Sequence, residues 1–340
     1  MRVEFTVDIS NSEALEAMGR EGRIDRSRLV DLAWAAESAG IDRLLIGDGG
    51  GTRDTIPVAS YFLHATAALG VEVEHRAGLL APEAAALQIA TLDQLSGGRV
   101  TVRLMPQGGE ASSHQESFAR LDEYAVLLKR LWANDKPIDF EGRFHRLEAA
   151  FSGTKPFSDS VPIAIAGASG TAVKVAARHA DIVLLPATST AEIRRTIERV
   201  RQAAAGHRRA DAVRFALPVR LIAEENVASM NGHESGRFAR VGSGWSSPKS
   251  VRPRSAHQVS AVTLAGSPEK LALALSDYAE AGVTDFIVVG LRTAHEISNF
   301  GGGIVSQVRS AFAQRDGLRN EGWRPGYMRS VFARSTRQPA

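Results

Sequence analysis

A short turn that contains glycine and serine, residues 167–170 (Gly-Ala-Ser-Gly), is the clearest candidate for binding an anionic group. It stands between the apolar run 162–166 and a helical pattern over 171–179. Backbone N–H groups at the start of a helix bind phosphate well, and glycine lets a ligand approach the backbone closely. We therefore expect Gly167, Ala168 and Ser169 to contact a phosphate, the alternative being that Ser169 is an ordinary helix N-cap.

Three arginines stand in or beside apolar runs: Arg76 ends one run, Arg220 lies within a second and Arg292 follows a third. A guanidinium binds a carboxylate or phosphate through two parallel hydrogen bonds, so these residues suit an anionic substrate or cofactor. The alternative is that they form structural ion pairs, with Asp48 or Asp54 as partners. The pattern leaves open which of two neighbours, His75 or Arg76, points toward such a ligand.

Several other chemistries lack their usual residues. The chain has no cysteine, so neither disulfides nor a thiolate nucleophile can form. The closest two of its nine histidines, His64 and His75, lack metal-binding spacing, and we expect no metal site. A Gly-x-Ser-x-Gly nucleophile motif and a phosphate-binding P-loop are also missing.

Short apolar, β-branched runs alternate with longer helical patterns along the chain, which is typical of parallel βα units. The predicted strands are Val3–Ile9, Arg43–Ile46, Val71–His75, Val100–Met105, Pro162–Ala166, Ile182–Leu185, Val213–Ala223 and Asp285–Val289. The helices after them are predicted at 26–39, 55–69, 82–95, 118–132, 171–179, 191–205, 268–281 and near 304–314. Eight strands exceed what a doubly wound sheet usually holds, so the pattern predicts a (β/α)8 TIM barrel over residues 1–314.

Two segments interrupt the alternation, after strands four and seven. Residues 135–160 include a predicted hairpin around Gly142. Residues 224–262 include Asn226–Ser260, which is rich in Gly, Ser and Arg and has neither a helical nor a strand period. A long aperiodic loop at the functional end of a barrel is more often a lid than simply disordered, so we expect a lid there.

The net charge of +3 comes from a basic C-terminal tail, residues 315–340, in which six Arg outnumber Asp316 and Glu321. The remaining body is therefore close to neutral, and we expect no nucleic-acid partner. No apolar run is long enough for a membrane span, and the first residues read as a strand rather than a signal peptide. A cytoplasmic protein without membrane contact is the expectation.

Four motifs in the correct order resemble those of the bacterial luciferase-like flavin-dependent monooxygenases, most closely the alkanesulfonate monooxygenase branch. They are Ala90–Arg99 (ATLDQLSGGR), Asp139–His145 (DFEGRFH), Pro162–Ser169 (PIAIAGAS) and Ala281–Ile287 (AGVTDFI). The resemblance covers about residues 26–295. It implies a TIM barrel and a two-component enzyme that takes reduced FMN from a separate flavin reductase and uses it with O₂. A small-molecule substrate and a homodimer or homotetramer are expected with it.

The resemblance also implies cofactor contacts. Gln107, Gly108 and Gly109 stand where the family has a Thr-Gly-Gly beside the flavin, with Gln107 in place of the threonine. Tyr124 falls where the family has a phosphate-contacting tyrosine, the alternative being a core or interface aromatic. Arg76 matches a position that is Arg in the relatives.

The catalytic positions of the alkanesulfonate branch are all different in this chain. Where the branch has Cys, Arg, His and Tyr, this chain has Thr52, Pro218, Arg220 and Leu291. Sulfonate oxidation by the branch's own mechanism is therefore not expected. We expect Arg76, Arg220 and Thr52 to serve catalysis, on a small organic substrate that is anionic or contains sulfur.

Two other functions remain compatible with the sequence. One is a deazaflavin-dependent hydride-transfer enzyme on the same barrel. The other is a barrel that binds flavin but has lost catalysis, as the four changed positions would allow.

Overall fold

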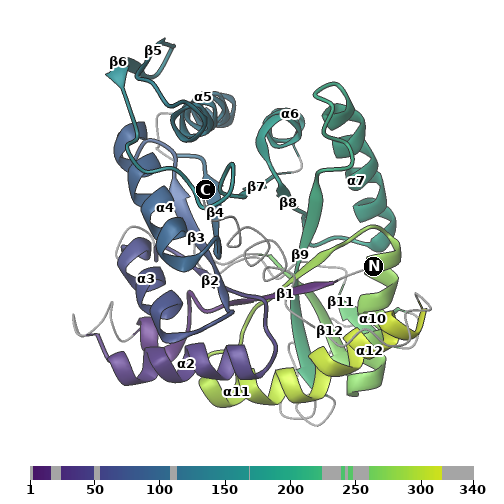
Figure 1. The fold of residues 1–340 in the computed structure, drawn as a ribbon. Helices are drawn as coiled ribbons and strands as arrows, with labels where there is room; N and C mark the ends of the chain where they lie inside the picture. The colour runs from purple at the N-terminus through teal and green to yellow at the C-terminus, as the bar shows by residue number, and fades with distance from the viewer. Residues whose placement is uncertain are drawn as a thin grey trace, which may run out of the picture.

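The computed structural model describes residues 3–16, 24–49, 54–107, 113–167, 169–223, 239–241, 244–247 and 260–315. Eight parallel strands close into a barrel with helices packed around it, as the sequence predicts (Figure 1). In spatial order the barrel strands are β1 (Glu4–Asp8), β2 (Arg43–Ile46), β3 (Gly70–Arg76), β4 (Val100–Met105), β7 (Ile163–Ala166), β8 (Ile182–Leu184), β9 (Arg214–Ala223) and β13 (Asp285–Val288).

The helices begin and end at the residues that their capping chemistry favours. Ser113, Ser169, Ser189 and Ser267 each cap a helix by accepting a backbone N–H bond. Their bounds are α2 (Arg26–Ser38), α3 (Thr55–Ala65), α4 (Pro82–Ser96), α5 (His114–Ala133), α6 (Gly170–His179), α7 (Thr190–Ala205), α10 (Pro268–Glu280), α11 (Ala294–Phe300) and α12 (Ser306–Arg315). Within the described chain, none of these helices combines the length and apolar character of a membrane span.

Strand β9 has two neighbours along one of its edges. Its first half pairs with β8 over residues 214–216, and its second half pairs with an added parallel strand, β12 (Val262–Gly266), over 219–223. Pro218 lies between these two pairings. Because proline has no N–H to donate, a position between two pairings tolerates it.

The inside of the barrel has an apolar half and a charged half. The apolar half, mostly from β7, β8, β9 and β13, is a cluster separate from the core beneath the helices: Leu45, Ala164, Ile182, Leu184, Ala216 and Ile287. On the other side, Arg103 of β4 donates to Glu72 of β3 at 2.6 Å, and their side chains are 1% and 3% exposed. Charge of this kind persists inside a barrel only when it is paired.

A second group of charges closes the N-terminal end of the barrel, where the strands begin; we call it the floor network. Arg43 on β2 donates to Glu4 on β1 at 2.5 Å and to Asp285 on β13 at 2.6 Å. Arg214 on β9 reaches the same Glu4 oxygen at 2.7 Å. The network therefore connects four strands through side chains alone.

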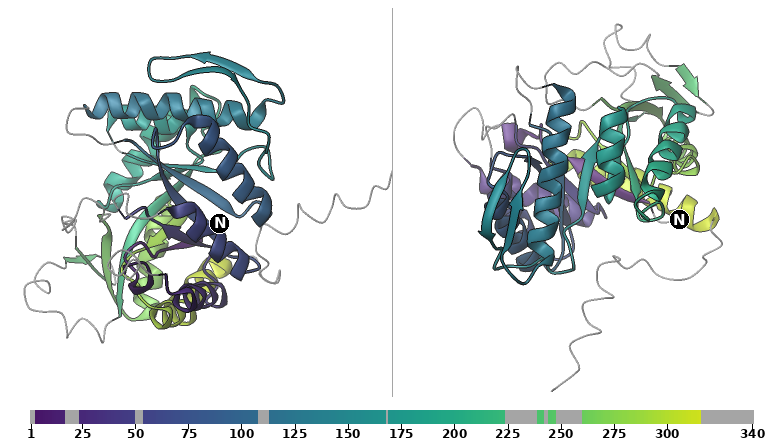
Figure 2. Two further views of the ribbon diagram at one scale, coloured as in Figure 1. Left: turned by 90° about the vertical axis from the view of Figure 1, so that its left-hand side faces the viewer. Right: turned by 90° about the horizontal axis from the view of Figure 1, so that it is seen from above.

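The segment after α5 forms the predicted hairpin, β5 (Ile138–Glu141) paired antiparallel with β6 (Arg146–Ala150). The hairpin lies along the outside of α5 in both views of Figure 2. Its turn is fixed by Glu123 of α5, whose carboxylate accepts the backbone N–H groups of Arg143, Phe144 and His145 at 2.6–3.0 Å. The insertion is therefore attached to the barrel's helix layer rather than extended into solvent.

Besides missing strand β12, the sequence prediction was wrong in two places in the C-terminal third. Residues 226–260, expected to lack regular structure, include β10 (Ala239–Val241) and β11 (Gly244–Ser247), which continue the sheet from β12. The last helix begins at Ala294, not near 304, and runs through a π-helical segment, η1 (Gly301–Val305). The rest of the expected lid and the tail 316–340 lie outside the described residues.

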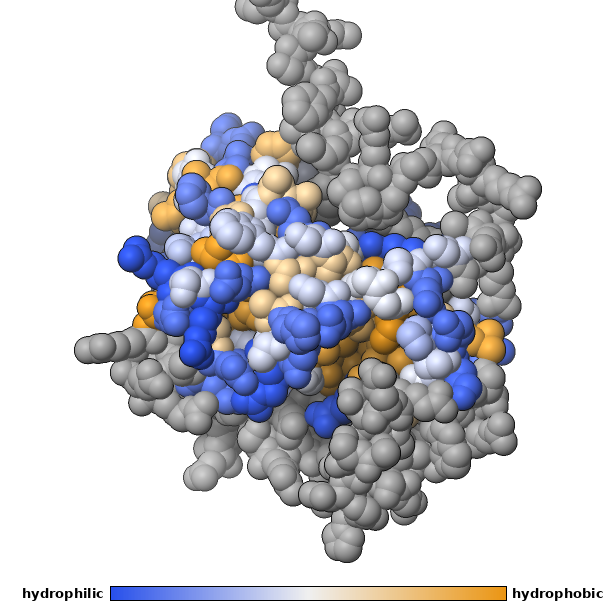
Figure 3. Space-filling view, turned by 90° about the horizontal axis from the view of Figure 1, so that it is seen from below, coloured by the Kyte–Doolittle hydropathy of each residue, from blue (hydrophilic) through white to orange (hydrophobic). Residues whose placement is uncertain are grey.

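Helices α2 and α11 pack closely because Gly301 has no side chain. A Cβ at Gly301 would lie 2.2 Å from the Cβ of Ala39, just after α2. Figure 3 shows the face of the molecule on which these helices lie, with a band of apolar atoms between hydrophilic regions. This side of the helix layer is therefore closed by backbone contact.

Candidate functional site

The strand register settles which of His75 and Arg76 points into the barrel. Residues that pair across neighbouring strands share a side, and Glu74 pairs through Arg103 with Ala164 of the interior cluster. Arg76, two residues after Glu74, therefore faces the C-terminal mouth of the barrel. His75 faces outward, where its Nε2 lies 2.8 Å from the hydroxyl of Tyr124 on α5.

Arg76 is held by Asp48, which follows β2. Its Nη2 donates to Asp48 Oδ1 at 3.1 Å, and its Nε donates to the other carboxylate oxygen. Its side chain remains 31% exposed, so one edge of the guanidinium is still accessible. Arg76 is thus both an ion-pair residue and a group at the mouth, so the two interpretations of the sequence do not exclude each other.

Glu74 lies beneath this pair and is a site residue that sequence reasoning missed. Its Oε2 accepts the N–H of Asp48 at 3.3 Å, and a Cβ at Gly47 would lie 2.9 Å from it. Burial, together with the carboxylates of Asp8 and Asp48, raises the pKa of Glu74 against the opposing charge of Arg103. The sequence feature that could have identified Glu74 is the alternation of Glu72, Glu74 and Arg76, which marks one polar face of a strand.

Arg220 lies across the mouth from Arg76. It shares the inward side of β9 with Ala216 of the interior cluster, and β9 is the fourth strand from β3 around the barrel. Its Nε would lie 3.6 Å from a Cβ at Gly290, which follows β13 and has φ +97°. Within the described part of the chain it has no carboxylate within 4.0 Å.

Arg292, the third expected cation, differs from Arg220. Its Nη2 donates to Glu16 at 2.7 Å, and its side chain is 47% exposed. Exposed pairs of this kind contribute little to binding or stability. Of the three arginines proposed for the mouth, Arg220 is therefore the one whose charge is not already matched by a described carboxylate.

The expected phosphate turn opens α6 as the sequence predicts. Ser169 caps the helix, accepting the N–H of Ala172 at 3.3 Å. Gly167 has φ +151°, and a Cβ there would lie 2.2 Å from that of Ala172, so glycine is required by close packing. Among the described residues, a Cβ at Gly170 would meet nothing within 4 Å, which leaves room there for a ligand beside the first N–H groups of the helix.

Tyr124 and Gln107 lie on the other side of α5 from this turn. Tyr124 is fully buried, and its hydroxyl donates to the carbonyl of Leu80 at 3.2 Å while contacting His75. Gln107 is exposed, and its Oε1 would lie 2.9 Å from a Cβ at Gly78. Their roles at a cofactor stay predictions, as do those of Thr52, Gly108, Gly109 and Ala168, which lie outside the described residues.

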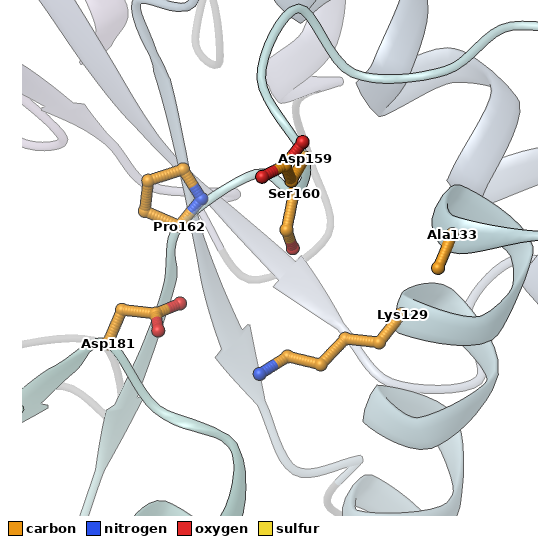
Figure 4. A pocket seen from close by; sticks show the side chains of 6 residues that line it. All are labelled: Lys129, Ala133, Asp159, Ser160, Pro162 and Asp181. Carbon is orange, nitrogen blue, oxygen red and sulfur yellow. The ribbon is translucent and has the colours of Figure 1, made fainter. Parts of the chain in front are cut away.

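A cavity of about 430 Å³ lies at the opposite end of the barrel (Figure 4). Pro162 and Asp181 line it directly before β7 and β8, and Lys129 reaches it from α5. Two of the charged groups that line it already have partners, since Lys129 donates to the carbonyl of His179 at 2.8 Å and Arg209 binds Asp181 at 2.5 Å. Active sites of this fold lie at the C-terminal ends of the strands, so the mouth is the candidate site.

Burial of His75 predicts an acid-sensitive stability. Burial lowers the pKa of His75 from 6.5 to about 4, so the unfolded chain binds the extra proton between these values. We expect the free energy of unfolding to fall by on the order of 2–3 kcal/mol as the pH drops from 6.5 to about 4. We expect His75→Gln to remove this part of the pH dependence. Thermal melts from pH 7 to 4 measure it, with exposed His64→Gln as the control. A His75→Gln slope equal to that of the wild type would contradict the assignment.

Comparison with known proteins gives one family. The model of the luciferase-like monooxygenase family matches residues 1–285. A long-chain alkane monooxygenase structure is similar with a TM-score of 0.74 at 15% identity, over 99% of this chain and 96% of that one. EDTA monooxygenase from Chelativorans sp. BNC1 gives 0.71 at 18% identity, over 97% of both chains.

A hydride-transfer enzyme shares the fold as well. An F420-dependent secondary alcohol dehydrogenase gives a TM-score of 0.69 at 18% identity, over 90% of this chain and 99% of that one. At such identities these structures show a common barrel, and the chemistry of this chain has to be argued from its own residues.

Proposed function

Because this chain belongs to the luciferase-like monooxygenase family, we propose that it is a flavin-dependent monooxygenase that uses reduced FMN and O₂ at the mouth of the barrel. A separate flavin reductase supplies the reduced cofactor. The observation that carries the proposal is the capped start of α6, where no described neighbour would meet a Cβ at Gly170 within 4 Å.

The residues at the mouth fit a flavin in two respects. The start of α6 offers N–H groups to a phosphate. The apolar half of the interior, including Leu184 and Ile287, with Ala166 and Val289 packed against it, offers a surface for a planar ring system. Bound reduced FMN supplies two electrons, so that one atom of O₂ enters the substrate and the other leaves as water.

The protein's own groups position the substrate and handle charge. Arg220 binds an anionic group of the substrate across the mouth from the Arg76–Asp48 pair. Glu74, whose pKa is raised by burial, accepts the N–H of Asp48 below the mouth and so positions the carboxylate that holds Arg76. The apolar wall excludes water from the reacting atoms. The substrate is accordingly a small organic acid, such as a sulfonate or carboxylate.

Ser169→Ala tests the phosphate contact. The hydroxyl can accept the N–H of Ala172 and still donate to a phosphate, so its loss should weaken reduced FMN about tenfold. The same change removes a helix cap and costs about 1 kcal/mol of stability. Ser189→Ala removes the equivalent cap of α7 and is the matched control. Equal reduced-FMN dissociation constants for the two variants would place the phosphate elsewhere.

A deazaflavin-dependent hydride transfer is the second candidate, because the F420-dependent dehydrogenase shares this barrel. The two functions differ in the cofactor that the protein binds and in whether turnover needs O₂. A monooxygenase binds reduced FMN and consumes O₂ with its substrate, whereas the hydride-transfer enzyme binds reduced deazaflavin and turns over without O₂. If the barrel binds a flavin but shows turnover neither with O₂ nor without it, it has lost catalysis.

A further inference from the structure

Three buried polar atoms on the barrel strands have no hydrogen-bond partner among the described residues. They are Thr6 Oγ1 on β1, Arg43 Nε on β2 and Arg103 Nη2 on β4, and these residues are 1%, 6% and 1% exposed. Buried polar groups in proteins are nearly always hydrogen-bonded, because burying one without a partner costs free energy. The described chain has three other such atoms, but none of them lies on a barrel strand. The interior of the barrel therefore calls for a partner that the described residues do not supply.

All three side chains point to the inside of the barrel. Thr6 pairs with Ile287 of the interior cluster on one side and with Arg43 on the other. Arg103 pairs with Ala164 of the same cluster. Residues that pair across neighbouring strands share a side of the sheet, so Arg43 faces inward as well. The three unpaired atoms therefore face the closed interior and not the helix layer.

The unpaired atoms belong to one polar region. Thr6 stands opposite Arg43 and two residues after Glu4, which accepts a hydrogen bond from Arg43 at 2.5 Å. Glu72 interacts electrostatically with Arg43 and accepts a hydrogen bond from Arg103 Nε at 2.6 Å. The three atoms thus lie where the floor network meets the Arg103–Glu72 pair.

The chemistry of this region favours water over an ion. Two of the unpaired atoms belong to guanidinium groups, which only donate hydrogen bonds, so their ligand is an acceptor and not a cation. The carboxylates of Glu4, Asp285 and Glu72 lie in the same region and oppose an anion. Water is neutral, accepts from a guanidinium and can also bond to the Thr6 hydroxyl. A buried water typically makes about three such hydrogen bonds.

We propose that the charged half of the barrel binds ordered internal water between Thr6, Arg43 and Arg103. This water joins the floor network to the Arg103–Glu72 pair. Because Arg103 Nη1 lies 3.9 Å from Glu74 Oε1, polar contacts then run through the barrel from its floor to Glu74, below the mouth. The inference is independent of the proposed function, since it concerns the interior below the candidate site.

A high-resolution crystal structure of the full chain is the first test. It should show water density within hydrogen-bonding distance of Thr6 Oγ1 and of at least one of the two unpaired guanidinium atoms. Absence of density beside these atoms would overturn the proposal. Density that belongs to a chloride ion, identified by its anomalous signal, would overturn it too, because the carboxylates would then not exclude an anion.

Thermal melts of Thr6→Val are the second test. The change keeps the shape of the side chain and replaces its hydroxyl with a methyl group. If the hydroxyl binds water, the melting temperature should fall by about 1–4 °C, because a buried hydrogen bond is lost. Thr66→Val is the control, since the buried Thr66 hydroxyl donates to the carbonyl of Phe62 at 2.8 Å and its loss gives the shift for a satisfied threonine.

The sign of the Thr6→Val shift separates the two possible states of the hydroxyl. Removal of a buried hydroxyl that has no partner stabilises a protein, so a variant that melts above the wild type would contradict the proposal. Should Thr6→Val fail to fold, the crystal structure of the wild type decides alone, by the presence or absence of water beside these atoms.

Discussion

Arg43→Met should lower the free energy of unfolding by about 3–5 kcal/mol, the largest stability effect expected for this chain. The change leaves Glu4 and Asp285 facing each other at the floor of the barrel, with side chains only 15% and 1% exposed. Arg43 and Arg214 overcome the effect of burial and hold the pKa of Glu4 at about 2, so Glu4 stays charged at neutral pH. Urea unfolding at pH 7 measures the loss.

Arg195→Met is the matched control for the floor network. Arg195 also pairs with a glutamate, Glu192 at 3.5 Å, but its side chain is 74% exposed, so its loss should cost less than about 1 kcal/mol. If Arg43→Met cost no more than the control, the buried pairs would not stabilise the barrel. A second change, Glu4→Gln, should recover part of the loss because Arg214, which reaches both Glu4 and Asp285, would then face one carboxylate instead of two.

Arg220→Ala should lower kcat/KM for anionic substrates by about a hundredfold while leaving reduced-FMN affinity within a few-fold. The expected loss corresponds to one or two charge-assisted hydrogen bonds, about 2–3 kcal/mol. Arg220→Lys should recover part of the activity, because it keeps the charge without the planar fork. O₂ consumption with linear alkanesulfonates and carboxylates measures it.

Arg292→Ala is the control for Arg220. Arg292 lies near the same end of the barrel but is paired with Glu16 and is 47% exposed, so its removal should change kcat/KM less than threefold. Should Arg220→Ala behave like Arg292→Ala, Arg220 is structural and the substrate is anchored by another group. A higher kcat/KM of the wild type for an uncharged long-chain alkane than for any acid would also show that Arg220 does not anchor the substrate.

Much of the barrel could be predicted because each unit is encoded locally. The β-branched runs of β3 and β4 and the helical patterns after them give the alternation without reference to the rest of the chain. The strand β12 was missed because Val262–Gly266 is short and follows a long aperiodic segment. Nothing in five apolar residues shows that they pair with the far half of β9, since that pairing depends on where β8 ends.

The site was less predictable because it depends on register. The turn at Ser169 is a local feature, and its helix cap follows from its own sequence. Which of His75 and Arg76 faces inward could not be decided, because a barrel strand is buried on both sides and alternation has no intrinsic inside. The pairing of Arg76 with Asp48 and the burial of Glu74 likewise follow only from the positions of three neighbouring strands.

The central claim is that this barrel binds reduced flavin at its C-terminal mouth and uses it with O₂. The most direct test is an anaerobic titration with reduced FMN, followed by a pulse of O₂ in the presence of a sulfonate or carboxylate substrate. The account predicts saturable binding and formation of an oxygenated product in step with O₂ consumption. Absence of reduced-FMN binding, together with binding of reduced deazaflavin and substrate turnover without O₂, would contradict it.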